Sequence, residues 1–275
     1  MKNIISLIFA LNAVLLSVNA QTLSKETVII ETDYGKMKIK LFEETPLHKA
    51  NFLKLVKQKV FDSLLFHRVI NEFMIQGGDL LSKKAKRGDS LGHGDMGYTI
   101  PAEINPKLIH KKGVLAAARE SDDINPKFES SAAQFYIVMG KKKTIEDLKK
   151  AEDRINKAHY NNCAGAFMKT DEGKQLKKRY DRLKTENNTD SAVFVNAQIE
   201  AFIKTEHLRT PEYKFNQQQI DTYTTVGGTP HLDGTYTVFG EVIEGMEVID
   251  KIAAAKKDSR DRPLEDIRMK ISLIK

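Results

Sequence analysis

Cysteine and tryptophan are almost absent from the sequence: among 275 residues there is one cysteine, Cys163, and no tryptophan. A single cysteine cannot form an intramolecular disulfide, so the fold depends on its apolar core. The same scarcity argues against a structural zinc site, and the seven histidines show neither HxxxH nor HExxH spacing. We find no base close to Cys163 in the sequence and interpret it as structural or incidental. The sequence therefore predicts no metal and no cofactor.

A strong excess of one charge is also missing. The 44 Lys and Arg residues against 37 Asp and Glu give a formal net charge of +7, and acidic residues are interspersed throughout. The densest basic runs, Lys141 to Lys143 and Lys177 to Arg179, lie next to acidic residues, which is typical of a solvated surface. A nucleic-acid-binding protein would more often gather its basic residues on one face with aromatic residues among them. We therefore expect no nucleic-acid partner.

Only one long apolar run occurs, and it lies at the N-terminus. Lys2 precedes a nearly continuous apolar stretch from Ile4 to Val18, followed by the small-residue site Val18-Asn19-Ala20. This pattern is typical of a secretory signal peptide, residues 1–20, cleaved after Ala20. The alternative is a retained membrane anchor, although the run is short for a full span. We expect an exported protein, periplasmic or secreted, with no stable membrane span after cleavage.

The mature chain begins with strand patterns and one clear helix. Met37, Ile39 and Leu41 alternate with lysines, as in a half-buried strand. Thr45-Pro46 then predicts a helix start, with Thr45 as the N-cap and proline at the first helical position. Further short strands are expected near residues 66–70, 114–118, 134–139 and 236–242, with a helix at 246–254 and a last strand at 267–274.

Between about 141 and 227 the pattern changes to helical spacing. Thr144, Thr170 and Asp190 are expected N-caps, and Thr210-Pro211-Glu212 is expected to start a helix. The strands that follow would have no core of their own. We therefore interpret residues 21–275 as one β-rich domain interrupted by a helical insertion at about 141–227. Its ends lie close in sequence to Tyr136 and Leu232, which places the insertion near those residues.

Three segments carry a resemblance to a known family. They are residues 66–79 (FHRVINEFMIQGGD), 130–137 (SSAAQFYI) and 231–240 (HLDGTYTVFG). In sequence and order they resemble the signature of cyclophilin-type peptidyl-prolyl cis-trans isomerases over about 26–140 and 228–275. The resemblance implies a closed eight-stranded antiparallel barrel with two capping helices and a substrate groove on its outer face.

The resemblance also implies site residues and a role for each. Arg68 matches the catalytic arginine, and Gln76 matches the residue that bonds the substrate backbone and helps to hold that arginine. Phe73 completes the catalytic set, and Phe73, Met74, Tyr136 and Leu232 match the pocket for the proline ring. The remaining residues expected to bind substrate are His67, Ala118, Gln134, Phe135, His231 and Tyr236.

The implied activity is isomerisation of X-Pro bonds in exported polypeptides, with Arg68 donating a hydrogen bond to the proline nitrogen in the twisted transition state. Some positions depart from the common family pattern: His231 replaces a tryptophan, Tyr236 a histidine, and Arg119 a rim asparagine. These departures concern substrate preference more than activity. Two other interpretations stay open: a non-catalytic chaperone or partner-binding module, and a scaffold whose insertion recruits a partner. Proline-containing polypeptides are the expected partners, and the oligomeric state is unknown, with a monomer favoured.

Overall fold

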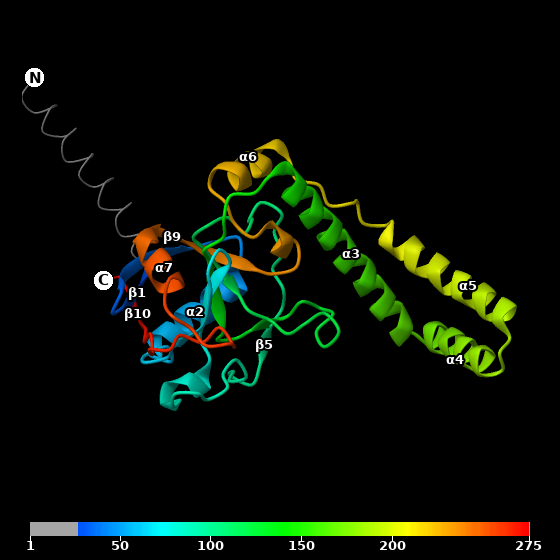
Figure 1. The fold of residues 1–275 in the computed structure, drawn as a ribbon, viewed down its shortest axis with the longest axis horizontal. Coiled ribbons are helices and arrows are strands. Elements are labelled where there is room, and N and C mark those ends of the chain that lie inside the picture. Colours follow the sequence, from blue (N-terminus) through cyan, green and yellow to red (C-terminus); the bar gives the residue numbers. More distant parts are fainter. Residues whose placement is uncertain (1–26, 275) are drawn as a thin grey trace, which may run out of the picture.

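The computed structural model describes residues 27–274, so the predicted signal peptide lies outside the described residues. The β elements are β1 (Thr27–Thr32), β2 (Gly35–Leu41), β3 (Phe66–Ile70), β4 (Met74–Gly77), β5 (Thr99–Ile100), β6 (Val114–Ala117), β7 (Ser130–Ser131), β8 (Phe135–Val138), β9 (Val238–Glu244) and β10 (Lys270–Leu273). The helices are α2 (Pro46–Lys57), α3 (Ile145–Lys169), α4 (Asp171–Thr185), α5 (Thr189–His207), α6 (Gln217–Thr225) and α7 (Met246–Ala253), with short 3₁₀ turns η1 (Leu80–Lys84) and η2 (Pro230–Leu232). Figure 1 shows the strands gathered in one body, from which the α3–α5 helices extend.

Eight strands form one antiparallel sheet in the order β10-β1-β2-β9-β6-β8-β4-β3, which confirms the predicted mainly β fold. The predicted eight-stranded barrel is closed only in part. The two edge strands, β3 and β10, do not pair with each other along their length. A single bridge between Leu65 and Arg268 joins the segments that precede them. Hydrogen bonds at 2.9 Å from the Phe66 amide to the Ile267 carbonyl and at 2.8 Å from the Met269 amide to the Leu64 carbonyl reinforce it.

The core lies on the inner face of this sheet. Ile75 pairs with Ile137, which also pairs with Leu115, so three neighbouring strands present one apolar row inward. Helix α2 adds Phe52, Leu55 and Val56, and helix α7 adds Val248, Ile249 and Ile252. Because burying each large apolar side chain contributes roughly 1.5–3 kcal/mol, these two helices are held by their apolar faces.

The start of α2 is stabilised differently from the sequence prediction. The Thr45 side chain makes no capping hydrogen bond. Instead the Glu103 carboxylate accepts from the Leu47 amide at 3.0 Å and from the His48 amide at 2.9 Å. A carboxylate suits this position, because the first amides of a helix lack partners and carry partial positive charge. A distant loop therefore supplies the cap that Thr45 was expected to provide.

The helical insertion follows β8. Thr144 accepts from the Asp147 amide in a capping box, and Thr170 accepts from the Gly173 amide, as predicted. The other two predicted helix starts are wrong. Asn188, not Asp190, is the N-cap of α5. No helix begins at Thr210-Pro211; residues 211–216 are irregular, and α6 starts only after Asn216, which caps it through Gln219.

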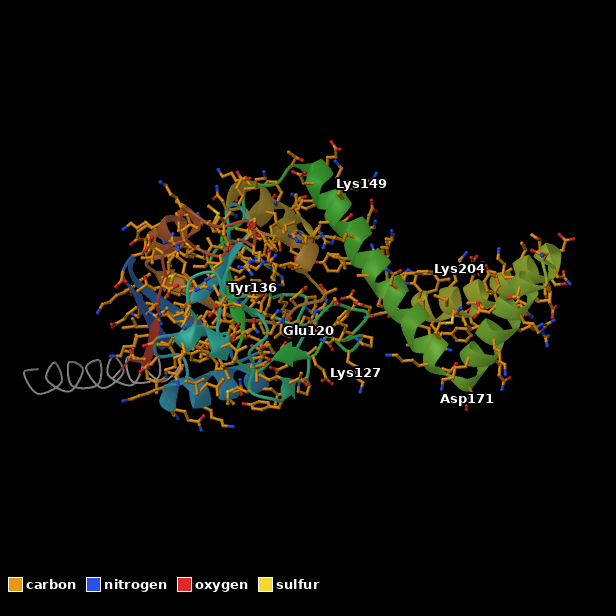
Figure 2. All side chains as sticks on the ribbon, turned by 60° about the horizontal axis from the view of Figure 1, so that its bottom comes forward. Glu120, Lys127, Tyr136, Lys149, Asp171 and Lys204 are labelled. Atoms are coloured by element: carbon orange, nitrogen blue, oxygen red, sulfur yellow. The ribbon has the colours of Figure 1, made fainter. Side chains whose placement is uncertain are left out.

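The insertion has two separate apolar clusters. The proximal cluster, next to the barrel, contains Leu148, Ala151, Ile155, Phe215 and Tyr223. The distal cluster packs α3, α4 and α5 together through Phe167, Leu183, Ala192, Val195, Ile199 and Ile203. Figure 2 shows Asp171 and Lys204 on this projecting part, well away from Tyr136 in the barrel. We call residues 157–212 the distal arm. The described residues include no helix long and apolar enough to span a bilayer.

Candidate functional site

The register of four neighbouring strands brings the candidate site together on the outer face of the sheet. Arg68 on β3 lies opposite Gln76 on β4, Gln76 lies opposite Tyr136 on β8, and Tyr136 lies opposite Ala116 on β6. Directly opposed residues of antiparallel strands point to the same face. The row therefore runs from a charged edge at Arg68 to an apolar patch that contains Tyr136 and Ala116.

A chain of hydrogen bonds holds the polar part of this row. The Arg68 guanidinium donates from Nη1 to Gln76 Oε1 at 3.4 Å. Gln76 Nε2 donates to Gln134 Oε1 at 3.2 Å. Gln134 Nε2 in turn donates to the carbonyls of Gly92 and Gly94 at 3.0 and 3.1 Å. The exposed arginine is thus tied through two amides to the backbone of the loop that crosses the site.

A cavity of about 150 Å³ opens beside Arg68. Eight of the predicted site residues line it: Arg68, Phe73, Met74, Gln76, Ala118, Tyr136, Leu232 and Tyr236. Phe73, Met74, Ala118 and Leu232 form its apolar part, and Arg68, Gln76 and Arg119 supply charged and amide groups. That combination suits a small apolar ring whose flanking peptide bond needs polar partners.

The other four predicted residues lie around this cavity rather than in its lining. Gln134 supports Gln76 from behind, and His231 stacks on Phe73 with ring centroids 5.7 Å apart. Phe135 points into the core on the opposite side of β8, 1% exposed and edge-on to Phe52. His67 is buried, 4% exposed, beneath the strand that carries Arg68. Burial lowers the pKa of His67 to about 4 and that of His231 to about 4, so both rings are neutral at neutral pH.

The resemblance marks Arg119 only as a departure at the rim of the site. In the structure, Arg119 contributes to the lining of the site itself. It lines the 150 Å³ cavity and also a neighbouring cavity of about 380 Å³, and Gln76 and Ala118 line both as well. Its guanidinium lies over the Tyr236 ring, 4.3 Å from the centroid, and pairs with Asp122 at 2.7 Å. The ring below and the carboxylate beside it hold this arginine between the two cavities.

A buried hydrogen-bond network supports the floor of the cavity, and sequence reasoning missed it. Asp233 Oδ1 accepts from the His110 amide at 2.8 Å and lies 2.7 Å from its Nδ1. With Nδ1 donating to Asp233, a neutral His110 accepts at Nε2 from the Tyr136 hydroxyl, 3.0 Å away. Burial raises the pKa of Tyr136 well above its ordinary value, so this phenol keeps its proton.

Two tyrosines of the helical insertion complete this network at Asp233. Asp233 Oδ2 accepts from the Tyr223 hydroxyl at 2.6 Å, and the Tyr213 hydroxyl lies 3.4 Å away. Tyr223 is fully buried and sits on α6, while Tyr213 lies in the irregular segment before it. A side chain of the insertion is therefore connected to Tyr136 through Asp233 and His110. No short motif marks this connection, since its members lie far apart in the sequence.

A much larger cavity than the one beside Arg68 lies elsewhere. It has a volume of about 1070 Å³ and lies between the 106–111 segment of the barrel and residues 211–222 of the insertion. None of the predicted site residues lines it. Size alone would therefore select a different region, whereas the convergence of charged, amide and aromatic side chains selects the smaller cavity beside Arg68.

Comparisons with known proteins agree with this architecture. The sequence profile of the cyclophilin type peptidyl-prolyl cis-trans isomerase family matches residues 27–202 and 164–272. A Staphylococcus aureus protein named as a peptidyl-prolyl cis-trans isomerase is 26% identical over 241 residues, which cover 87% of each chain. A Streptococcus pyogenes protein named as a bifunctional phosphatase/peptidyl-prolyl cis-trans isomerase is 28% identical, over 87% of this chain but only 37% of that protein.

Among solved structures, a Cryptosporidium parvum cyclophilin type peptidyl-prolyl cis-trans isomerase has the same fold. Its TM-score is 0.51 at 20% identity, over 90% of this chain and 96% of that one. The family match and the relatives named above define the class of protein as a rotamase, an enzyme that catalyses rotation about peptide bonds without making or breaking one. The chain belongs to the cyclophilin-type peptidyl-prolyl cis-trans isomerase family.

Proposed function

We propose that this isomerase acts on X-Pro bonds of exported polypeptides, with Arg68 as the hydrogen-bond donor that stabilises the twisted transition state. The observation that carries the proposal is the cavity in which Arg68 and Gln76 face an apolar pocket made by Phe73, Met74 and Tyr136. The pocket would take the proline ring, and the polar edge would take the peptide bond that precedes it.

The reaction needs electrostatics rather than a nucleophile. Rotation about a peptide bond faces a barrier of about 18–20 kcal/mol because resonance is lost when the bond twists. In the twisted state the proline nitrogen regains a localised lone pair. A donor aimed at that nitrogen binds the transition state more tightly than either planar state, which lowers the barrier.

Arg68 suits this role because its guanidinium is always charged and carries several N–H donors in a rigid plane. Its hydrogen bond to Gln76 restricts its orientation before substrate arrives. Gln76 is itself fixed by Gln134, so the donor is held by a series of side chains anchored on backbone carbonyls. Holding a donor in place in advance avoids the cost of reorganising it during the reaction.

The exported setting rests on the N-terminal sequence alone. The apolar run from Ile4 to Val18 and the small residues before Gln21 are the features of a cleaved signal. In such a compartment X-Pro isomerisation, which takes tens to hundreds of seconds uncatalysed, is slow enough to limit the folding of newly exported chains. Fusing residues 1–20 to a reporter that is active only after export tests this part of the proposal, and a reporter retained in the cytoplasm would refute it.

The catalytic part is tested with Arg68→Ala in a proline-tetrapeptide isomerisation assay. We expect kcat/KM to fall at least tenfold, equivalent to about 1.4 kcal/mol of transition-state stabilisation. Arg179→Ala is the matched control, because Arg179 is exposed on α4 of the distal arm. Circular dichroism establishes that both variants are folded. If Arg68→Ala retains the unmodified rate, Arg68 is not the donor.

A further inference from the structure

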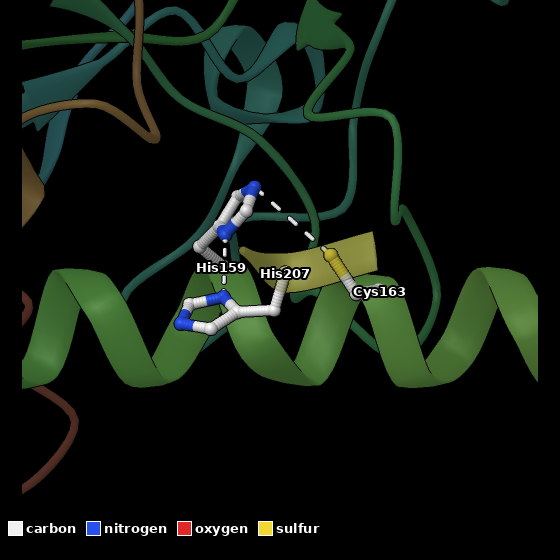
Figure 3. A group of neighbouring side chains, drawn as sticks. All are labelled: His159, Cys163 and His207. Carbon is white, nitrogen blue, oxygen red and sulfur yellow. Dashed lines mark hydrogen bonds between the residues drawn. The ribbon is translucent and has the colours of Figure 1, made fainter. Parts of the chain in front are cut away.

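Three potential metal ligands meet in the distal arm, outside the isomerase site. His159 and Cys163 lie one turn apart on α3, and His207 is the last residue of α5 (Figure 3). One ligand atom from each lies within 4.8 Å of the other two. Our interpretation that Cys163 has no base nearby is therefore wrong, because His159 Nε2 lies 4.0 Å from its Sγ.

The contacts within this group are close. The two Nδ1 atoms of His159 and His207 lie 2.8 Å apart, so one imidazole must donate and the other accept. Figure 3 shows the two rings turned toward one another, with the Cys163 sulfur on the other side of His159. All three side chains are partly exposed, so an ion can reach them from solvent.

The ligand types and their spacing suit a transition metal. Zinc binds imidazole nitrogen at about 2.0–2.1 Å and thiolate sulfur at about 2.3 Å, usually with tetrahedral geometry. Those bond lengths require ligand atoms roughly 3.3–3.6 Å from each other, so the three side chains, whose ligand atoms lie within 4.8 Å of one another, must adjust their spacing on binding. Positions i and i+4 of a helix lie on one face, which keeps His159 and Cys163 directed at the same point.

We propose that His159, Cys163 and His207 form a site for one divalent transition-metal ion, with zinc as the favoured occupant and water as the remaining ligand. The mixed nitrogen and sulfur set selects zinc over magnesium or calcium, which prefer oxygen ligands. A bound ion would join α3 to the C-terminal end of α5, next to the buried cluster of the distal arm against which Cys163 packs.

Neighbouring side chains also contact the residues of this metal site. The Tyr160 ring contacts His207 edge-on, with centroids 5.5 Å apart, and limits the movement of that imidazole. Glu206 forms an ion pair with Arg209 at 3.0 Å and thus is already engaged beside the site. The contacts of His207 with Tyr160 and His159, both on α3, keep its imidazole directed at that helix.

The first test is a titration of the full-length chain with Co²⁺ under reducing conditions, because a cobalt–thiolate bond produces a charge-transfer absorption that reports the sulfur ligand directly. We expect saturation at one equivalent, with the absorption lost on addition of Zn²⁺. Cys163→Ser should abolish the absorption, and His159→Gln and His207→Gln should each weaken binding at least tenfold. His93→Gln is the control, since His93 is an exposed histidine in the barrel, and should bind cobalt as the unmodified chain does.

The second test measures thermal unfolding with and without Zn²⁺. An ion that binds only the folded arm raises its melting temperature. We expect this rise in the unmodified chain and in His93→Gln but not in Cys163→Ser or His207→Gln, with circular dichroism showing that all four retain their helices. Absence of the charge-transfer band, or equal cobalt binding by all the variants, would overturn the proposal. Neither readout involves isomerase activity, so the result is independent of the proposed catalytic role.

Discussion

At the scale of single residues, His67 shows how burial changes the chemistry of a side chain beside the site. It directly precedes Arg68 on β3, yet its ring is buried while the guanidinium is exposed. Burial, the largest influence, lowers the pKa of His67 to about 4, whereas the nearby Asp79 carboxylate acts in the opposite direction. The imidazole is therefore a neutral packing element at neutral pH, and it supplies no proton to the reaction.

This burial predicts a pH-dependent stability. The unfolded chain binds a proton at His67 near its ordinary pKa of 6.5, while the folded chain does so only near 4. The contribution of His67 is therefore complete above pH 6.5 and is lost as the pH falls from 6.5 to 4, at up to about 1.4 kcal/mol per pH unit.

His67→Gln should flatten the fall in the free energy of unfolding between pH 6.5 and 4, measured by urea denaturation. Burial also lowers the pKa of His231. The free energy of unfolding of the variant should therefore still fall in part over this pH range. Equal slopes in the variant and the unmodified chain would mean that folding does not lower the pKa of His67.

At the scale of elements, α6 is more than an addition to the barrel. Its Tyr223 donates to Asp233, Asp233 holds His110, and His110 bonds the Tyr136 hydroxyl in the cavity. The proximal insertion therefore positions a residue that lines the proposed proline pocket. Its ends are also fixed to the barrel, since Gly228 bridges both Lys111 and Lys141.

Tyr223→Phe should lower both activity and stability, because it removes a 2.6 Å hydrogen bond and leaves Asp233 Oδ2 with only the longer contact to Tyr213. We expect a loss of about 1–3 kcal/mol in unfolding free energy and a several-fold lower kcat/KM on tetrapeptides. Tyr180→Phe, in the distal arm, is the matched control and should change neither quantity.

A double-mutant cycle separates positioning from general destabilisation. If the network links the two tyrosines, Tyr136→Phe and Tyr223→Phe together should lower kcat/KM by less than the product of the two single effects. Strictly multiplicative effects would show that α6 does not act through Tyr136.

At the scale of the whole molecule, the insertion divides into a part that supports the site and a part that projects from it (Figure 2). The division falls at Asn156 and Tyr213, whose side-chain amide and backbone exchange two hydrogen bonds, of 3.1 and 2.8 Å. These two residues are therefore neighbours, so the distal arm between them can be removed without stretching the chain.

Replacing the distal arm, residues 157–212, with a short glycine linker should leave a folded barrel and unchanged turnover of proline tetrapeptides. Tyr213, Phe215 and Tyr223 remain, so the support of Asp233 is retained. A proline-limited refolding protein should be a poorer substrate for the shortened enzyme, because only a long chain can reach the exposed Val193 and Phe194 on α5.

The matched comparison is replacement of residues 142–226, which also removes Tyr223 and should reduce tetrapeptide turnover. Loss of tetrapeptide turnover in the shorter deletion, with the barrel folded, would contradict this division of the insertion.

The sequence by itself determined the family, the mainly β fold and the identity of the residues around Arg68. These depend on local patterns: Arg68, Phe73 and Gln76 lie within one hairpin, whose strands necessarily face each other, and Thr144 and Thr170 cap helices through residues three positions away. Such short-range relations can be predicted because the geometry of a strand pair or a helical turn sets them.

Only the tertiary structure decided the rest. Partial closure of the sheet depends on how the segments before β3 and β10 meet. The N-terminal cap of α2 comes from the distant Glu103. Tyr136 is supported by Tyr223 through Asp233 and His110. His110 and Asp233 are 123 positions apart, and His159 and His207 are 48 apart, so no local pattern could indicate that they touch. Contacts of this kind form only when the packing of whole elements brings distant segments together, because backbone geometry restricts neighbours in sequence but not residues this far apart.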